Sequence, residues 1–420
     1  MGLLGISDEV YRLAERAEAD ADGAFRAIDA VAGLNTEKVL SAFQRHRVSD
    51  GCFGGTTGYG YNDKGRETLD MIFADVMGAP SALVRAGFVS GTHAITAAMF
   101  AALRPGQKLL SVTGKPYDTL LGVIGLSGGY RGSLKEYGIG YSQVELAPGG
   151  VPDYKAIADA ARGEDVGAVF IQRSRGYSSR RALAVREIGE ICEVVRKAGG
   201  ARAGGGDIAL VVDNCYGEFT EAIEPGEVGA DLIAGSLIKN PGGGLAPMGG
   251  YVAGRGDLVE AAAFRLTSPG IGAECGATMG VNRMLYQGLF MAPHIVAQAM
   301  KTAVFCARLF ELMGYGTSPG YLEPRSDIIQ MVELGAPELL ERFCKGIQAG
   351  SPVDSYVTPE AWDMPGYGHK VIMAAGAFVQ GASIELSADG PMRAPYSAFV
   401  QGGLTYEAGK LGIMQAASYL

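Results

Sequence analysis

The N-terminal part of the chain carries a helical pattern of apolar residues. Apolar side chains recur at helical spacing over residues 8–32. The next stretch, NTEKVLSAFQRHRVS (35–49), predicts a second helix that begins with Asn35 as its N-cap. The segment DGCFGGTTGYGYNDKG (50–65) is too rich in glycine for regular structure, and it predicts a functional loop.

From about residue 80 onward, short apolar runs alternate with longer helical patterns. The predicted strands are SALVRAGFVSG (81–91), KLLSVTG (108–114), VGAVFIQRS (166–174), DIALVVDNCYGEF (207–219), ADLIAGSLIKN (230–240) and MGGYVAG (248–254), and the predicted helices are THAITAAMFAAL (92–103), YDTLLGVIG (117–125) and VREIGEICEVVRKAG (185–199). These strands are continuous Val, Ile and Leu runs, which is typical of a sheet covered on both faces. The pattern predicts a doubly wound α/β domain over roughly residues 60–290.

The pattern changes after a long predicted helix over residues 291–314. RSDIIQMVELG (325–335) and GASIELSADG (381–390) predict strands of a smaller α+β domain. We therefore expect a helical segment with a loop over 1–58, a large domain over 59–290 and a small C-terminal domain over 291–420.

The composition of the chain indicates which kinds of binding partner and which cellular compartment to expect. The net charge of −9 and the absence of a Lys/Arg stripe argue against a nucleic-acid partner. The six cysteines include no CxxC pair, so neither a zinc site nor a disulfide framework is expected, and a reduced cytoplasm is the simplest location. The N-terminus is charged by residue 8, which predicts no signal peptide. No apolar stretch reaches the roughly 18 to 20 residues that a membrane span needs, so no membrane partner is expected.

Polar residues follow several of the predicted strands. Asp213 ends IALVVD, Lys239 ends DLIAGSLIK, and Tyr117 comes just after KLLSVTGKP. Ser90, Gly91 and Thr92 mark the place where a strand gives way to a helix. Ligands of α/β sheets bind at the carboxyl ends of the strands, so we expect these residues to meet there.

Together they match the requirements of pyridoxal 5'-phosphate (PLP). Its aldehyde needs an amine to form a Schiff base, and its ring nitrogen needs a carboxylate that keeps a proton on it. Its phosphate suits a helix N-terminus, and its ring suits an aromatic side chain. Taken singly, each residue has an ordinary alternative: Lys239 as a surface lysine, Asp213 as a turn residue and Tyr117 as a core side chain.

The motifs GYGYNDKGRETLD, VSGTHAI, KPYDTL, VDNCYGEF and GSLIKNPGGG, in this order, carry a family resemblance. The chain resembles PLP-dependent Cys/Met-metabolism enzymes of fold type I, the aspartate-aminotransferase-like fold. Within them it is most similar to the cystathionine β-lyase and methionine γ-lyase-like group often labelled aluminium-resistance proteins. The resemblance covers essentially the whole chain.

The resemblance implies a role for each motif residue. Lys239 would form the Schiff base, Asp213 would face the pyridine nitrogen and Tyr117 would stack on the ring, and these are the expected catalytic residues. The phosphate would be bound by Ser90, Gly91, Thr92 and Ser236.

It also implies a site shared between subunits. Tyr59 would reach the phosphate site of a neighbouring subunit, so we expect a homo-oligomer, a tetramer built as a dimer of dimers with a dimer as the minimum. Better-known lyases have Tyr-x-Arg where this chain has Tyr59-Gly60-Tyr61. Arg66 is a candidate to replace the missing arginine, and Tyr61 is expected among the substrate-binding residues.

An amino-acid substrate presents a carboxylate, whose natural partner is a bidentate guanidinium. Arg393, in the part of the chain where the family usually provides one, is the leading candidate. Arg173, at the end of the strand VGAVFIQ, is the second, with a surface salt bridge as its alternative.

The expected function is that of a PLP-dependent carbon–sulfur lyase that acts on a small sulfur-containing amino acid by β- or γ-elimination. Two alternatives stay open. One is another fold-type-I reaction, such as transamination or aldol cleavage. The other is a stress-response protein that keeps the fold without turnover.

Overall fold

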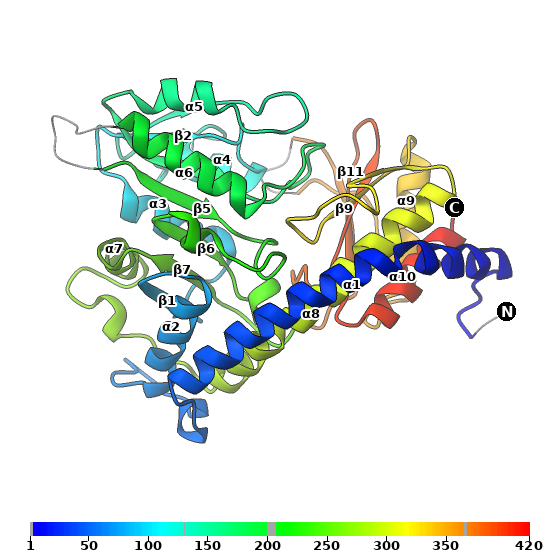
Figure 1. The fold of residues 1–420 in the computed structure, drawn as a ribbon, viewed down its shortest axis with the longest axis horizontal. Coiled ribbons are helices and arrows are strands. Elements are labelled where there is room, and N and C mark those ends of the chain that lie inside the picture. The colour runs from blue at the N-terminus through cyan, green and yellow to red at the C-terminus, as the bar shows by residue number, and fades with distance from the viewer. Residues whose placement is uncertain (1–2, 130, 200–206, 365–367) are drawn as a thin grey trace.

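The structure of the chain, a computed structural model, describes residues 3–129, 131–199, 207–364 and 368–420. These residues form two β-sheets, which Figure 1 shows on the two sides of the molecule. The long helices α1 and α8 run from one sheet to the other. The larger sheet has seven strands in the order β1-β7-β6-β5-β4-β2-β3, and the smaller has five in the order β10-β11-β12-β9-β8. This is the α/β fold with a mixed sheet and a smaller α+β unit that the sequence predicts.

The large sheet is mostly parallel. Its strands are β1 (Ser81–Arg85), β2 (Lys108–Ser111), β3 (Gly140–Gln143), β4 (Val166–Gln172), β5 (Ala209–Asp213), β6 (Leu232–Ser236) and β7 (Gly250–Gly254). β2 to β6 pair in parallel, whereas β7 and the edge strand β1 are antiparallel to their neighbours. β1 and β6 end earlier than the apolar runs suggested, so residues 86–90 and 237–239 form loops at the end of the strands.

Helices cover both faces of the large sheet. They are α2 (Lys64–Val76), α3 (Gly91–Ala102), α4 (Asp118–Ile124), α5 (Tyr154–Ala161), α6 (Val185–Gly199) and α7 (Gly256–Leu266). In β4, Phe170 belongs to the core cluster shared with α3 and α7, whereas Val169 and Ile171 belong to the cluster shared with α5 and α6. Successive side chains of a strand point to opposite faces, so burial on both faces explains the continuous apolar runs.

The small sheet is antiparallel throughout. Its strands are β8 (Gly316–Ser318), β9 (Gln330–Glu333), β10 (Val371–Ala375), β11 (Ser387–Pro391) and β12 (Ser397–Gln401). The helix α9 (Pro337–Ala349) packs on this sheet, and α10 (Tyr406–Ser418) packs on α9. The strands predicted within residues 325–335 and 381–390 are present as β9 and β11.

The first helix, α1 (Asp8–Arg45), corrects the prediction of two helices separated at Asn35. Asn35 lies inside one continuous helix and is fully buried. Its Nδ2 donates to the backbone carbonyls of Phe219 (3.2 Å) and Glu221 (2.9 Å), in the segment that follows β5. The side chain therefore binds a distant backbone segment and does not cap a helix.

The helix α8 (Asn282–Leu312) connects the two cores and lies along α1 (Figure 1). By length and composition alone it is apolar enough to cross a membrane, which the sequence pattern had not indicated. In the structure 78% of its apolar window is buried within the protein. Its buried residues from 285 to 304 pack in the core shared with α1 and α2, and those from 305 to 310 pack in the core of the small sheet, so its apolar character is explained by packing.

Candidate active site

Three neighbouring strands of the large sheet end at one edge and bring predicted polar residues together. β4, β5 and β6 are parallel, and Gln172 pairs with Asp213, which pairs with Ala234. Ser236 ends β6, and Lys239 follows three residues later. The strand register thus brings Asp213, Ser236 and Lys239 to the carboxyl edge, where α/β sheets bind ligands.

Asp213 is buried at the end of β5, with its side chain held by the backbone. The Cys215 backbone N–H donates to Asp213 Oδ1 over 3.1 Å. Burial raises the pKa of the Asp213 carboxyl, and the positive charge of Lys239 opposes that rise. A buried carboxylate is unfavourable unless a cation meets it, and Lys239 is the cation that acts on it most strongly.

The Lys239 side chain lies over the ring of Tyr216, with Nζ 4.0 Å from the ring centroid. Burial lowers the pKa of Lys239, whereas Cys215, Tyr216 and Asp213 raise it, and the net direction is upward. Burial also raises the pKa values of Cys215, Tyr216 and Asp213. Within the described ranges, no carboxylate oxygen lies within 4.0 Å of Nζ. The amine is therefore positioned without being held in a close ion pair.

Tyr216 is a site residue that the sequence patterns did not single out. Its backbone has φ of 71°, and Phe219 in the same segment has φ of 63°. Bulky residues seldom adopt this left-handed conformation, and backbone strain of this kind clusters at functional sites. The available signal was its place in VDNCYGEF, three residues after Asp213, but nothing in the spacing shows that its ring lies under Lys239.

The N-terminus of α3 approaches the ends of these strands. Ser90 is the N-cap, and its Oγ accepts a hydrogen bond from the His93 backbone N–H over 3.1 Å. A Cβ at Gly91 would lie 3.0 Å from Ser236 Cβ and 3.4 Å from Cys215 Sγ, so glycine allows the close approach of helix and strand. The first backbone N–H groups of a helix lack partners within the helix, and with the helix dipole they favour an anion.

Tyr117 is fixed beside this helix start. Its backbone N–H donates to Gln172 Oε1 over 3.0 Å, and its hydroxyl lies 3.0 Å from Thr92 Oγ1. Burial raises the pKa of the Tyr117 phenol, and the nearby charge of Asp213 raises it further. The phenol is neutral at neutral pH, and its ring can serve as one wall for a planar ligand.

These donors fit PLP. Lys239 offers an amine for the aldehyde, and the buried Asp213 offers a carboxylate that can hold a proton on a ring nitrogen. The helix start at residues 90–92 offers backbone N–H groups for a phosphate, and Gly91 keeps this end free of a Cβ. An amine for the PLP aldehyde, a carboxyl for its ring nitrogen and N–H groups for its phosphate thus lie at one edge of the sheet.

The loop that carries Tyr59 and Tyr61 is organised separately. The two rings are exposed (67% and 52%) and stacked, with centroids 5.5 Å apart. The buried Arg66 donates from Nη1 to the carbonyls of Gly60 and Gly276, each over 2.7 Å. Arg66 therefore braces the loop, and its role at a phosphate stays a prediction.

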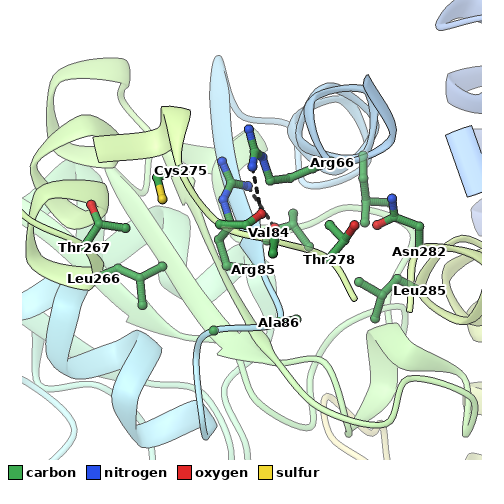
Figure 2. Close-up of a pocket in the computed structure, with 14 residues that line it drawn as sticks. Arg66, Val84, Arg85, Ala86, Leu266, Thr267, Cys275, Thr278, Asn282 and Leu285 are labelled. Atoms are coloured by element: carbon green, nitrogen blue, oxygen red, sulfur yellow. Dashed lines mark hydrogen bonds between the residues drawn. The ribbon is translucent and has the colours of Figure 1, made fainter. Parts of the chain in front are cut away.

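A cavity of about 250 Å³ lies beside this loop. Figure 2 shows Arg66 and Arg85 together on one side of it, with Leu266 and Leu285 on others. Arg85 is paired with Asp70 over 2.7 Å. None of the residues that line the cavity belongs to α3, β5 or β6, so it is distinct from the edge that carries Lys239.

The two arginines expected at the substrate take different places. Arg173 is fully buried, donating from Nη1 to Asn214 Oδ1 (2.7 Å) and from Nη2 to Glu221 Oε1 (2.9 Å). The structure thus does not open Arg173 to a substrate carboxylate, nor is it a surface residue. Arg393 is exposed and reaches from the small domain to the loop after β4, where its Nη2 donates to the Tyr177 carbonyl over 3.0 Å.

The sequence matches the family model for methionine gamma-lyase over residues 10–420. The chain belongs to this family. A carbon-sulfur lyase involved in aluminum resistance from Clostridium novyi NT is 51% identical, with a TM-score of 0.94 over 99% of this chain and 96% of that one. The uncharacterized protein YnbB of Bacillus subtilis (strain 168) is 49% identical over 410 residues, which are 97% of this chain and 96% of YnbB.

More distant structures share only the fold. The pyridoxal-5'-phosphate dependent protein YhfS from Escherichia coli is 17% identical, with a TM-score of 0.62 over 94% of this chain and 97% of its own. The methionine gamma-lyase family and this fold confirm the resemblance that the five sequence motifs carry. In this member of the methionine gamma-lyase family, the edge of β4, β5 and β6 is therefore the candidate active site.

Proposed function

We propose that the protein is a PLP-dependent carbon–sulfur lyase that acts on a sulfur-containing amino acid by β- or γ-elimination. The observation that carries the proposal is the meeting of Lys239, Asp213 and the N-terminus of α3 at one sheet edge. Membership of the methionine gamma-lyase family and the likeness to the carbon-sulfur lyase of Clostridium novyi NT support this reaction class.

The bound cofactor supplies an electron sink for the charge that develops at the substrate Cα. Elimination also needs a base at Cα and a proton for the departing sulfur. Lys239 Nζ is the group that the geometry offers for this proton transfer once its amine is neutral, because it is held over the Tyr216 ring without a close ion pair. The proton that this nitrogen takes from Cα is then available to the sulfur as the carbon–sulfur bond breaks.

The neighbouring residues prepare this edge for the reaction. Asp213 presents a buried carboxyl at the sheet edge, and its carboxylate form would favour a protonated ring nitrogen. Tyr117 is fixed by Gln172 and Thr92, so its ring limits the positions that a planar ligand can take. γ-Elimination needs a second proton to leave Cβ before the carbon–sulfur bond breaks, and a nitrogen that still holds the Cα proton cannot accept it, so Lys239 would first have to pass that proton on.

The test of the reaction is an assay of products from three candidate substrates. We expect the purified holoenzyme to release a thiol, ammonia and a 2-oxo acid from cystathionine, methionine or cysteine. Pyruvate as the 2-oxo acid identifies β-elimination, and 2-oxobutyrate identifies γ-elimination. Accumulation of pyridoxamine phosphate without thiol release would refute the lyase assignment in favour of transamination.

The attachment site is tested separately from turnover. Borohydride reduction followed by peptide mapping is expected to find the cofactor on the peptide that contains Lys239. The Lys239→Ala variant should lose this label and the activity, whereas Lys64→Ala, which changes an exposed lysine on α2, should keep both. A labelled peptide elsewhere, or activity in Lys239→Ala, would overturn the assignment.

We also propose that the working unit is at least a homodimer, assembled further into a tetramer. The support is the pair of exposed, stacked rings of Tyr59 and Tyr61 on a loop that the buried Arg66 holds in shape. Exposed aromatic side chains on a rigid loop are typical of contacts with another chain.

A further inference from the structure

A group of arginines joins the large domain to the small domain next to the active-site edge. Arg175 and Arg180 come from the loop after β4, and Arg325 and Asp327 come from the segment before β9. The Arg175 backbone N–H donates to Asp327 Oδ2 over 3.0 Å, and its Nη2 donates to Ser318 Oγ over 3.0 Å. The arginine group, as these residues are called below, therefore links both domains.

The arginine group carries more positive than negative charge. Asp327 acts electrostatically on all three guanidinium groups, and the exposed Glu323 acts on Arg175 and Arg325. Burial lowers the pKa of Arg180 and of Arg325 to about 10, so both stay cationic at neutral pH. In the part of the chain that the structure describes, no carboxylate oxygen lies within 4.0 Å of any of the three guanidinium groups. The group is thus net positive and lacks a close anion.

Its hydrogen bonds are also incomplete. Arg325 is 9% exposed, and its Nε and Nη1 are buried without a partner among the described residues. Its Nη2 makes only long contacts of 3.4 Å with the carbonyls of Pro319 and Gly320. Buried donors without acceptors are unfavourable and call for a partner from outside the chain, such as water or an anion.

Arg180 is the member of this group that borders the active site. Its Nη2 donates over 2.9 Å to the carbonyl of Gln172, the residue that pairs with Asp213 in the sheet and whose side chain holds Tyr117. The charge of Asp213 also acts on Arg180. The buried guanidinium of Arg173, by contrast, already donates to Asn214 and Glu221, and Arg393 is exposed on the surface.

We propose that Arg180, supported by the positive charge of Arg175 and Arg325, binds the carboxylate of the amino-acid substrate. This proposal rests on the proposed function. A planar guanidinium can donate two parallel hydrogen bonds to the two oxygens of a carboxylate. The negative charge of the substrate carboxylate would also give the arginine group the close anion that it lacks. The phosphate of the cofactor is assigned to the N-terminus of α3, which leaves the arginine group to the substrate.

A purely structural role for Arg180 is the competing explanation, because its donors bind the backbone carbonyls of Gln172, Ser174 and Arg181. The two roles differ in one measurable way. A loop brace affects every ligand of the site alike, whereas a carboxylate-binding arginine affects acids and leaves the matching amides unchanged.

The experiment compares L-alanine with L-alaninamide on the holoenzyme. Neither has a sulfur leaving group, so dissociation constants can be followed through the visible absorption of the cofactor. In Arg180→Gln we expect affinity for L-alanine to fall about 100-fold, in line with the loss of a buried charge pair, and affinity for L-alaninamide to stay as in the wild type. The affinity of Arg180→Lys for L-alanine should lie between that of the wild type and that of Arg180→Gln.

Arg181→Gln is the matched control, because Arg181 is adjacent but paired with Glu187. It should bind both ligands as the wild type does. An unchanged acid-to-amide preference in a folded, cofactor-loaded Arg180→Gln would overturn the proposal, and if that variant does not fold, the same result in Arg180→Lys would do so. A wild-type protein that never acquires a cofactor band would instead refute the proposed function itself.

Discussion

Gly242 is predicted to control both stability and the position of Lys239. It is buried in the turn over Asn240–Gly242, which starts directly after Lys239. A Cβ at Gly242 would lie 1.8 Å from the Leu237 carbonyl oxygen and 2.6 Å from Ala246 Cβ. From the other side, a Cβ at Gly288 in α8 would lie 2.2 Å from the Gly242 carbonyl oxygen, so the turn has no room to move towards α8.

The size of the effect follows from these distances. Non-bonded heavy atoms are most favourable at about 3.5–4.0 Å, so Gly242→Ala must displace the backbone by more than about 1 Å. Overpacking of a buried site costs about 1–3 kcal/mol, and occasionally more. Because Lys239 precedes the turn, Nζ should shift by a similar amount, and a misplacement of about 1 Å can reduce a rate on the order of 100-fold.

The assay pairs Gly242→Ala with Gly33→Ala. Gly33 is an exposed residue of α1, where an added Cβ meets nothing within 4 Å, so alanine there should stabilise the protein by about 0.5–1 kcal/mol through helix propensity. Urea unfolding of the apoprotein, followed by circular dichroism, should move in opposite directions for the two variants, and lyase activity should fall only in Gly242→Ala. A Gly242→Ala midpoint equal to the wild-type value would refute the steric reasoning.

Two further predictions concern pH and assembly. Burial raises the pKa of Glu218 to about 8 from its usual 4.5, so the stability that its protonated form provides is complete at low pH and is lost as the pH rises through about 8. Glu218→Gln can still accept the hydrogen bond from the Tyr251 hydroxyl (2.9 Å). It should remove a slope of about 1.4 kcal/mol per pH unit from the free energy of unfolding between pH 5 and 8, and an unchanged slope would contradict the assignment. The double variant Tyr59→Ala/Tyr61→Ala should dissociate more readily in sedimentation velocity than Tyr356→Ala, a control on another exposed tyrosine, and equal dissociation would remove this loop from the subunit contact.

Local sequence signals predict most of the fold, and the exceptions have physical causes. β4, β5 and β6 are buried on both faces, so their apolar runs are long enough to recognise. β3 was missed because Gly140–Gln143 is a partly exposed edge strand without an apolar run. The continuity of α1 could not be foreseen, because the partners of Asn35 lie 184 and 186 residues away along the chain.

The same contrast holds for the site. Asp213 and Ser90 were identifiable because each stands where a predicted strand or helix ends, which is a local feature. The burial of Arg173 depends on Asn214 and Glu221, which follow a neighbouring strand, so the sequence could not show that this arginine is enclosed. Tyr216 was missed because its contact with Lys239 depends on a left-handed backbone conformation, which a tyrosine in the sequence does not predict.

The hydrogen bonds from Asn35 to the carbonyls of Phe219 and Glu221 join the amino-terminal helix to the segment that follows β5. That segment also carries Tyr216, whose ring lies under Lys239, so cleavage of the chain after residue 35 would weaken the support of this segment. A truncated protein of that kind should therefore lose turnover before it loses its sheets, even though the severed helix touches no reacting atom. Truncation or fusion at this end is therefore expected to alter the candidate active site as well as the shape of the protein.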